Sequence, residues 1–130
     1  MLEELDALSI ARFHDAKLVD PGWPNAAAPS MLSGAWRWVD ANHRYNGLLW
    51  NEEDRARRTD VDPSEVAASK RLIDRHNQLR NDAVEAIDEA ILSLLNGAPR
   101  LPGARLSSET AGAMIDRLSI LALKIFHMRE

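Results

Sequence analysis

The sequence predicts an all-α protein, an antiparallel bundle of about four helices, and three observations support this fold class. Four segments can be placed as helices from the spacing of their apolar residues. Two breaks rich in proline and glycine, "VDPGWPNAAAPS" and "NGAPRLPGAR", interrupt the helical pattern. The alternation of β-branched and aromatic residues that is typical of strands is absent. A chain of 130 residues is expected to form a single domain, residues 1–130.

The first two helices are separated by the first of these breaks. The first helix is expected over Leu2–Leu18. It ends before the linker because proline lacks the backbone N–H that a continuing helix needs. The second helix is expected over Met31–Arg58.

The third helix has the clearest start signal in the chain. In "VDPSEV", Asp62 can serve as the N-cap, Pro63 fits the first helical position and Glu65 the third. The helix is expected to continue to Leu95, because Gly97 just beyond it is a natural helix stop.

The fourth helix is expected over Glu109–Met128, with Ser107 or Ser108 as its cap. Its sequence, "IDRLSILALKIFHM", is apolar on nearly all sides. A small four-helix monomer cannot easily cover so much apolar surface, so a homodimer is expected.

Composition excludes several classes of protein. A formal net charge of −4 argues against nucleic-acid binding by a basic surface. The absence of cysteine excludes disulfides, thiolate catalysis and cysteine-bound zinc. No apolar run reaches the 18 or so residues of a membrane span, since Lys124 interrupts "LSILALKIF". The acidic start "MLEELDAL" lacks the order of a signal peptide, so a cytoplasmic protein is expected.

Polar side chains follow one edge of the third helix. At about 100° per residue, the buried arc is expected to contain Ile73, Arg80, Val84, Ile87 and Ile91. Directly beside it, at spacings of 3, 4, 4 and 3, lie Asp74, Asn77, Asn81, Glu85 and Asp88. Because Asn and Asp are poor helix formers, we expect a neighbouring helix to contact this edge.

Two other helices carry polar arcs that can face this edge. The arc of the second helix contains His43, Asn46, Trp50, Asp54 and Arg57, with Glu53 at its margin. The arc of the fourth contains Asp116, Arg117, Lys124 and His127. Buried charges must be paired or bound, because desolvating a lone ion costs several kcal/mol. Either these groups cross-link the bundle, or the three edges enclose a polar pocket.

Three blocks of the chain resemble, in order, those of a bacterial family known only as domain of unknown function 4254 (DUF4254). The blocks are "NGLLWNEEDRAR", "KRLIDRHNQLRNDAVEAID" and "SETAGAMIDRLSILALKIFHM". The resemblance implies an uncharacterised protein without an assigned reaction. It also implies these motif positions: Asn46, Trp50, Glu53, Asp54, Lys70, Asp74, Asn77, Arg80, Asn81, Asp82, Glu85, Asp88, Asp116, Arg117, Lys124 and His127.

The pocket interpretation predicts a site for a small polar or anionic ligand containing phosphate or sugar. Its candidate ligand-binding residues are Asn46, Trp50, Arg57, Asp74, Asn77, Arg80, Asn81, Asp116, Arg117 and Lys124. His43 and His127 are the candidate catalytic bases, because imidazole titrates near neutral pH, although a structural imidazole hydrogen-bonded inside the bundle is the favoured interpretation of each.

Two alternatives stay open beside the ligand-binding module. The first is a Mg²⁺-dependent hydrolase acting on nucleotides, similar to MazG-type pyrophosphohydrolases. In that alternative Glu53, Asp54, Glu85 and Asp88 hold the metal, since hard carboxylate oxygens suit Mg²⁺. The second is a non-catalytic interaction subunit in which the buried charges serve only as cross-links.

Overall fold

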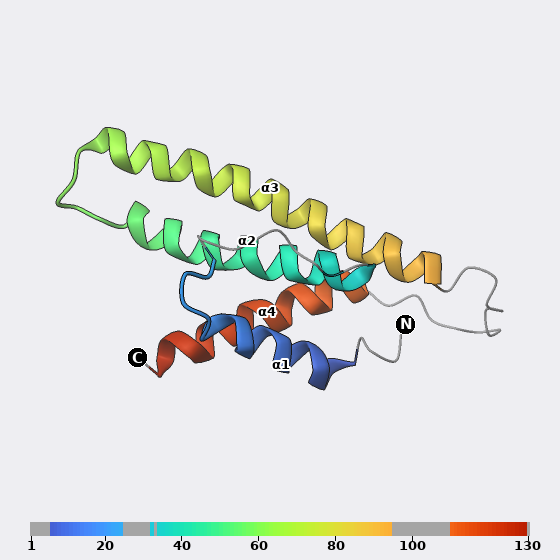
Figure 1. Ribbon diagram of the computed structural model, residues 1–130. Helices are drawn as coiled ribbons and strands as arrows, with labels where there is room; N and C mark the ends of the chain where they lie inside the picture. The colour runs from blue at the N-terminus through green and yellow to red at the C-terminus, as the bar shows by residue number, and fades with distance from the viewer. Residues whose placement is uncertain (1–5, 25–31, 33, 95–109, 130) are drawn as a thin grey trace.

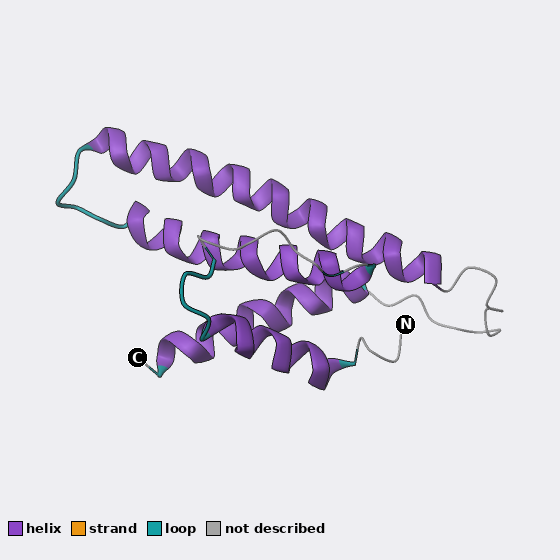
Figure 2. Cartoon of the chain, in the orientation of Figure 1, coloured by secondary structure: helices purple, strands orange, loops and turns teal. Residues whose placement is uncertain are grey.

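The chain folds into four helices, and the all-α fold class is confirmed. The structure is a computed structural model that describes residues 6–24, 32, 34–94 and 110–129. Its helices are α1 (Ala7–Leu18), α2 (Ala35–Ala56), α3 (Pro63–Leu94) and α4 (Ala111–Met128), shown in Figure 1. The described residues form helices and connecting turns, with no strand among them (Figure 2).

α4 contacts each of the other three helices. α2 and α3 form a long antiparallel hairpin, and α1 and α4 pack side by side below it (Figure 1). The core joins all four helices through the buried residues Ile10, Val39, Ile87 and Ile115. The side chains of Trp36 and Trp38 are partly buried and pack against this core.

The direction of α1 departs from an alternating bundle. α2, α3 and α4 alternate in direction as expected, but α1 runs parallel to α2 (Figure 1). The pairing of residues agrees, because Ile10 lies with Val39 in the core and His14 lies one turn further along, against His43. α1 and α2 therefore begin at the same end of the bundle (Figure 1).

Helix boundaries agree with the capping signals where these lie in the described part of the chain. α3 begins at Pro63, and the carbonyl of Asp62 accepts from the backbone N–H groups of Glu65 and Val66. α4 is capped by Thr110, whose hydroxyl accepts from Ala113 N, instead of by Ser107 or Ser108, which lie outside the described residues. α1 is capped by Asp6, and Leu2 to Leu5 also lie outside them.

Gly47 in the middle of α2 is explained by a close approach of the α1–α2 connection. A Cβ atom at Gly47 would lie 2.6 Å from Trp23 Cη2 and 3.1 Å from Pro24 Cγ. The turn is held there because Arg44 Nε donates to the carbonyl of Pro24 at 3.1 Å. Glycine thus costs helix propensity but makes room for the Trp23 ring against α2.

Gly47→Ala should lower the free energy of unfolding by about 1–3 kcal/mol, because overpacking outweighs the gain in helix propensity of about 1 kcal/mol. Chemical denaturation followed by circular dichroism measures this difference. In a Trp23→Ala background only the 3.1 Å approach of Pro24 Cγ remains, so the same substitution should cost less or become neutral. A stabilising effect in both backgrounds would contradict the packing role of Gly47.

Candidate functional site

A cluster of polar side chains fills the space between α1, α2 and α4. We call it the buried polar cluster, and its members are His14 of α1, Asn42, His43 and Asn46 of α2, and Asp116 and Ser119 of α4. All except Asp116, which is half-buried, have less than a twentieth of their surface exposed. Buried polar groups of this kind must satisfy one another or bind a ligand.

The carboxylate of Asp116 is held by two amides from α2. Its Oδ1 accepts from Asn42 Nδ2 and from Asn46 Nδ2, each at 2.9 Å. Asn46 Nδ2 also donates to the hydroxyl of Ser119 at 3.1 Å. Asn46 and Asp116, both expected in the site, are therefore brought together, and they contact each other directly.

His43 continues the network in one defined tautomer. Its Nε2 lies 3.1 Å from the carbonyl oxygen of His14, which can only accept, so this nitrogen carries the proton. Nδ1 is then the acceptor for the Ser119 hydroxyl at 2.6 Å. Burial, assisted by the nearby His14 and Lys17, lowers the pKa of His43 to about 3. A base this weak and fully buried is unsuited to general base catalysis at neutral pH.

The ring of His14 lies against the ring of His43. The two ring centroids are 4.2 Å apart, and the ring of Trp23 lies 4.6 Å from that of His43, tilted by 31°. Among the described residues neither ring nitrogen of His14 has a hydrogen-bond partner. Burial lowers the pKa of His14 to about 4, so this imidazole is neutral at pH 7.

The polar edge of α3 does not join this cluster, which corrects the expectation of three inward-facing edges. Asp74, Asn81 and Glu85 are exposed, while Asn77 and Arg80 are half-buried. Only the end of the edge meets α4, where Asp88 Oδ1 accepts from Gly112 N at 2.7 Å. α4 contacts α3 at this end because the two helices approach closely near Gly112, where an added Cβ would lie 2.5 Å from the carbonyl oxygen of Val84.

The remaining candidates on α2 lie elsewhere. Trp50 stacks in parallel on His127, with centroids 4.4 Å apart and 5° between the ring planes. Beside this pair is a small cavity of about 170 Å³, whose lining includes Trp23, Asn51, Phe126 and His127. Arg57 is exposed and forms an ion pair with Asp54 at 2.7 Å, so it does not face the cavity.

The four candidate metal ligands do not form one site. Glu53 and Asp54 lie near the turn between α2 and α3, whereas Glu85 and Asp88 lie in the last third of α3. At 1.5 Å per helical residue, about 30 Å of helix separates the two pairs. In the described part of the chain no group of three or more His, Asp or Glu side chains is placed to hold a metal ion.

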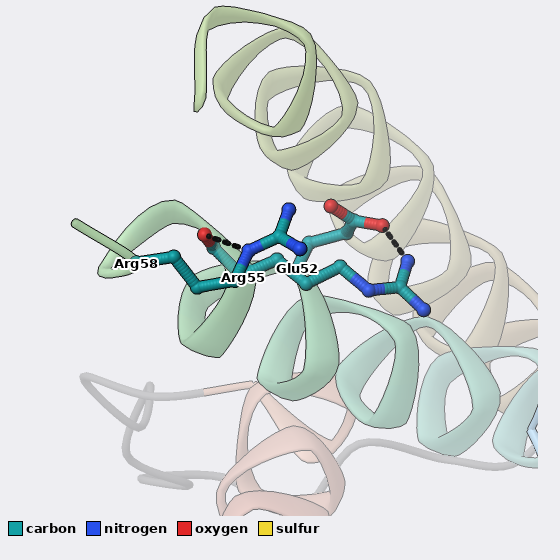
Figure 3. Close-up of polar contacts among 3 residues, drawn as sticks. All are labelled: Glu52, Arg55 and Arg58. Atoms are coloured by element: carbon teal, nitrogen blue, oxygen red, sulfur yellow. Dashed lines mark hydrogen bonds and ion pairs between the residues drawn. The ribbon is translucent and has the colours of Figure 1, made fainter. Parts of the chain in front are cut away.

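The acid that is buried at this turn is the neighbouring Glu52. Its Oε1 lies 2.6 Å from Arg55 Nη1, while its Oε2 has no hydrogen-bond partner among the described residues. Figure 3 shows the two side chains together, with Arg58 Nε donating to the carbonyl of Arg55 at 3.0 Å. Burial lowers the pKa of the nearby His76, and the charge of Glu52 opposes that shift. Glu52 and Glu53 are adjacent residues of the same type, so the sequence alone does not show which of them faces α3.

An exposed apolar strip on α4 is the feature that sequence reasoning located least well. We call it the α4 seam, and it consists of Met114, Leu118, Leu121, Ile125 and Met128, at spacings of 4, 3, 4 and 3. Four of these residues are exposed, whereas Leu118 is half-buried and also packs against the core. Leu121 keeps 52% of its surface exposed and Met128 keeps 83%. The regular spacing was a readable signal, but an all-round apolar helix does not reveal which side its neighbours cover.

Two grooves run beside the α4 seam. One, of about 510 Å³, is lined by seam residues together with Arg117, Ile120 and Lys124. The other, of about 330 Å³, lies between α1 and α4, and its lining includes Asp15, Val19 and Arg129. α4 is therefore a ridge with a hollow on each side. Among the described helices none is long and apolar enough to cross a membrane.

Acidification should destabilise the fold through its buried imidazoles. The pKa values of His14 and His43 are about 4 and about 3 in the folded protein, below the 6.5 of an unperturbed histidine. The unfolded chain thus binds more protons below pH 6.5, and the free energy of unfolding falls as the pH falls from about 6.5 to 4. The expected slope is about 1 kcal/mol per pH unit for each imidazole. Above pH 6.5 these groups should contribute no pH dependence.

Urea denaturation at pH 5, 6 and 7 measures that slope, and His14→Phe separates the contribution of one ring. Because His14 makes no hydrogen bond through its ring, the variant should fold and should lose about half of the slope. A variant that keeps the full pH dependence would show that His14 is not held neutral by burial.

Comparison with known proteins gives one match. A family model described as "Protein of unknown function (DUF4254)" matches residues 36–130. No curated protein and no solved structure matches the chain. The matched range contains α2, α3 and α4, with the α4 seam and every member of the buried polar cluster except His14. The chain therefore belongs to the DUF4254 family of proteins of unknown function.

Proposed function

We propose that this protein is a non-enzymatic interaction module that docks an amphipathic helix of a protein partner on the α4 seam. The observation that carries the proposal is an apolar strip at spacings of 4, 3, 4 and 3 between two grooves, in which four of the five residues are exposed and Leu118 is half-buried. This spacing is that of a helix–helix seam, in which each apolar side chain inserts between side chains of the facing helix. Helix-in-groove recognition uses the same geometry.

The distribution of exposed apolar residues supports docking at this face. Val19, directly after α1, is also exposed, at 76%, and it lines the groove shared with α4. Large apolar side chains gathered on one surface are typical of an interaction site, whereas scattered ones are ordinary. The neighbouring grooves give a partner helix room for the side chains at its flanks.

The chemistry of the interior supports a role without catalysis. The contact between Ser119 and His43 has the spacing of a nucleophile and its base, but both side chains are fully buried. Burial also holds the pKa of His43 at about 3, far from the value that serves a base at neutral pH. The polar groups of the interior act as cross-links in this proposal.

A designed peptide tests the docking surface. The probe is a three-heptad helix with leucine at the seam positions and glutamine at the flanking positions, labelled with fluorescein. It should bind the protein, and Leu121→Asp should weaken binding at least about tenfold, because a charge placed in the seam must be desolvated. Fluorescence anisotropy measures the affinity.

Leu72→Asp is the matched control, because Leu72 is also exposed, at 41%, but lies on α3. It should leave peptide binding unchanged. Equal loss in both variants would remove the α4 seam as the docking surface.

A second candidate function rests on the cavity beside the stacked Trp50 and His127. Aromatic rings of Trp23 and Phe126 and the polar groups of Asn51 and His127 could hold a small sugar or phosphate-containing ligand. This second candidate has the ligand class that the sequence predicts, but its site lies at the α1–α2 turn instead of at the polar edge of α3. No comparable arrangement supports the magnesium-dependent hydrolase.

Titration with monosaccharides and with inorganic phosphate, followed by tryptophan fluorescence, tests this second candidate. A saturable change that disappears in Asn51→Leu, but not in the exposed Asn81→Leu, is the expected result. A response that survives Asn51→Leu would place the ligand outside this cavity.

A further inference from the structure

The charges beside the α4 seam define what kind of helix can cover it. In heptad notation Leu118 and Ile125 occupy the a positions, and Met114, Leu121 and Met128 the d positions. Arg117 and Lys124 then both fall at g, the flanking position on one side of the seam, and both are exposed. Arg129 falls at e on the opposite side. Residues at e and g contact the flanks of the facing helix and select its charge.

We infer that the partner of the α4 seam is an amphipathic helix with acidic residues at its flanking positions. This inference rests on the proposed function and adds the chemistry of the partner to it. Glutamate or aspartate on the docked helix would lie beside Arg117 and Lys124 along the groove of about 510 Å³. The charged side chains in the described lining of this groove are Arg117 and Lys124, and both are basic, so an acidic flank of a partner helix is complementary to it.

A second copy of the chain is a poor occupant of the same seam. If two α4 helices paired in opposite directions, their g edges would meet, and Arg117 of each copy would approach Lys124 of the other. If they paired in the same direction, g would meet e, and Lys124 would approach Arg129 of the second copy. Like charges meet in either orientation, so the seam discriminates against self-association.

A lipid surface fits the seam less well than a helix does. A helix that lies in a membrane interface buries a broad apolar face and places its cations along the polar side. Here the apolar strip has the narrow 4–3 spacing of a helix–helix contact, and a groove lies on each side of it. Hollows beside a ridge accept the side chains of another helix, whereas a lipid surface would leave them unfilled.

Three versions of the peptide probe, with glutamate, glutamine or lysine at the flanks, test the inference by fluorescence anisotropy at low salt. The glutamate version should bind at least about tenfold more tightly than the lysine version, and added salt should reduce the difference. Lys124→Glu should remove or reverse this preference. Lys70→Glu, which changes an exposed cation on α3, should preserve it.

The outcomes separate this inference from the proposed function on which it rests. Equal affinity for all three peptides would overturn the charge selection and leave helix docking in place. Failure of every peptide to bind would remove both. Sedimentation velocity on the protein alone should show a monomer, and a dimer that dissociates in Leu121→Asp would make the second copy the occupant. Binding to phosphatidylserine vesicles that Leu121→Asp abolishes, without peptide binding, would assign the seam to lipid.

Discussion

The hydrogen bonds between the Asp116 carboxylate and the two asparagines of α2 determine how α4 is rotated, and the exposed surface follows from that rotation. Asp116 and Ser119 lie on the side of α4 opposite the α4 seam, because positions 116 and 119 correspond to f and b when the seam is a and d. Turning α4 to bury the seam would carry the carboxylate away from both amides. The buried amides of Asn42 and Asn46 would then lose their acceptor, and a buried donor without a partner costs about 1–3 kcal/mol.

In this arrangement the buried polar residues select one rotation of α4. An apolar helix such as α4 could pack against α1 and α2 on several faces with similar burial, since hydrophobic contact has no preferred direction. Hydrogen bonds to Asn42, Asn46 and His43 fit only one face, so they select one rotation. A second constraint acts at the start of the helix, where only glycine at position 112 permits the close approach to the Val84 carbonyl. We interpret the cluster as a device for orientation whose net contribution to stability is small.

The sequence predicts the elements of this fold well and their contacts poorly. Helix type and the start of α3 follow from local signals at Asp62 and Pro63, because capping depends only on neighbouring residues. The parallel direction of α1 depends on where a long connection returns the chain, and no local signal encodes that. Gly47 shows the same limit, since its neighbour Trp23 is distant in sequence. The resemblance to the DUF4254 family, seen in three sequence blocks, is confirmed.

The candidate site illustrates what helical spacing can and cannot establish. Spacing placed Asn46 and Asp116 on facing arcs, and they are bonded. The same reasoning predicts that the polar edge of α3 faces the interior, but Asp74, Asn81 and Glu85 are exposed. A polar edge beside an apolar arc looks identical in sequence whether a helix covers it or water does. The sequence pattern does not identify Asn42, Ser119 or His14 as members of the cluster. A single polar residue on an apolar helix gives no signal until its partners are known.

The overall charge of the chain does not contradict an acidic partner. The formal charge of −4 would repel an acidic helix at long range, but charges separated by more than about 8–10 Å are largely screened at physiological salt. At contact, the groups that matter are those within a few ångströms of the docked helix, which on the larger groove are Arg117 and Lys124. An exposed apolar strip with two cations along one edge is thus selective in two ways. Its side chains require a helix, and its edge repels a copy of itself while attracting a flank of opposite charge.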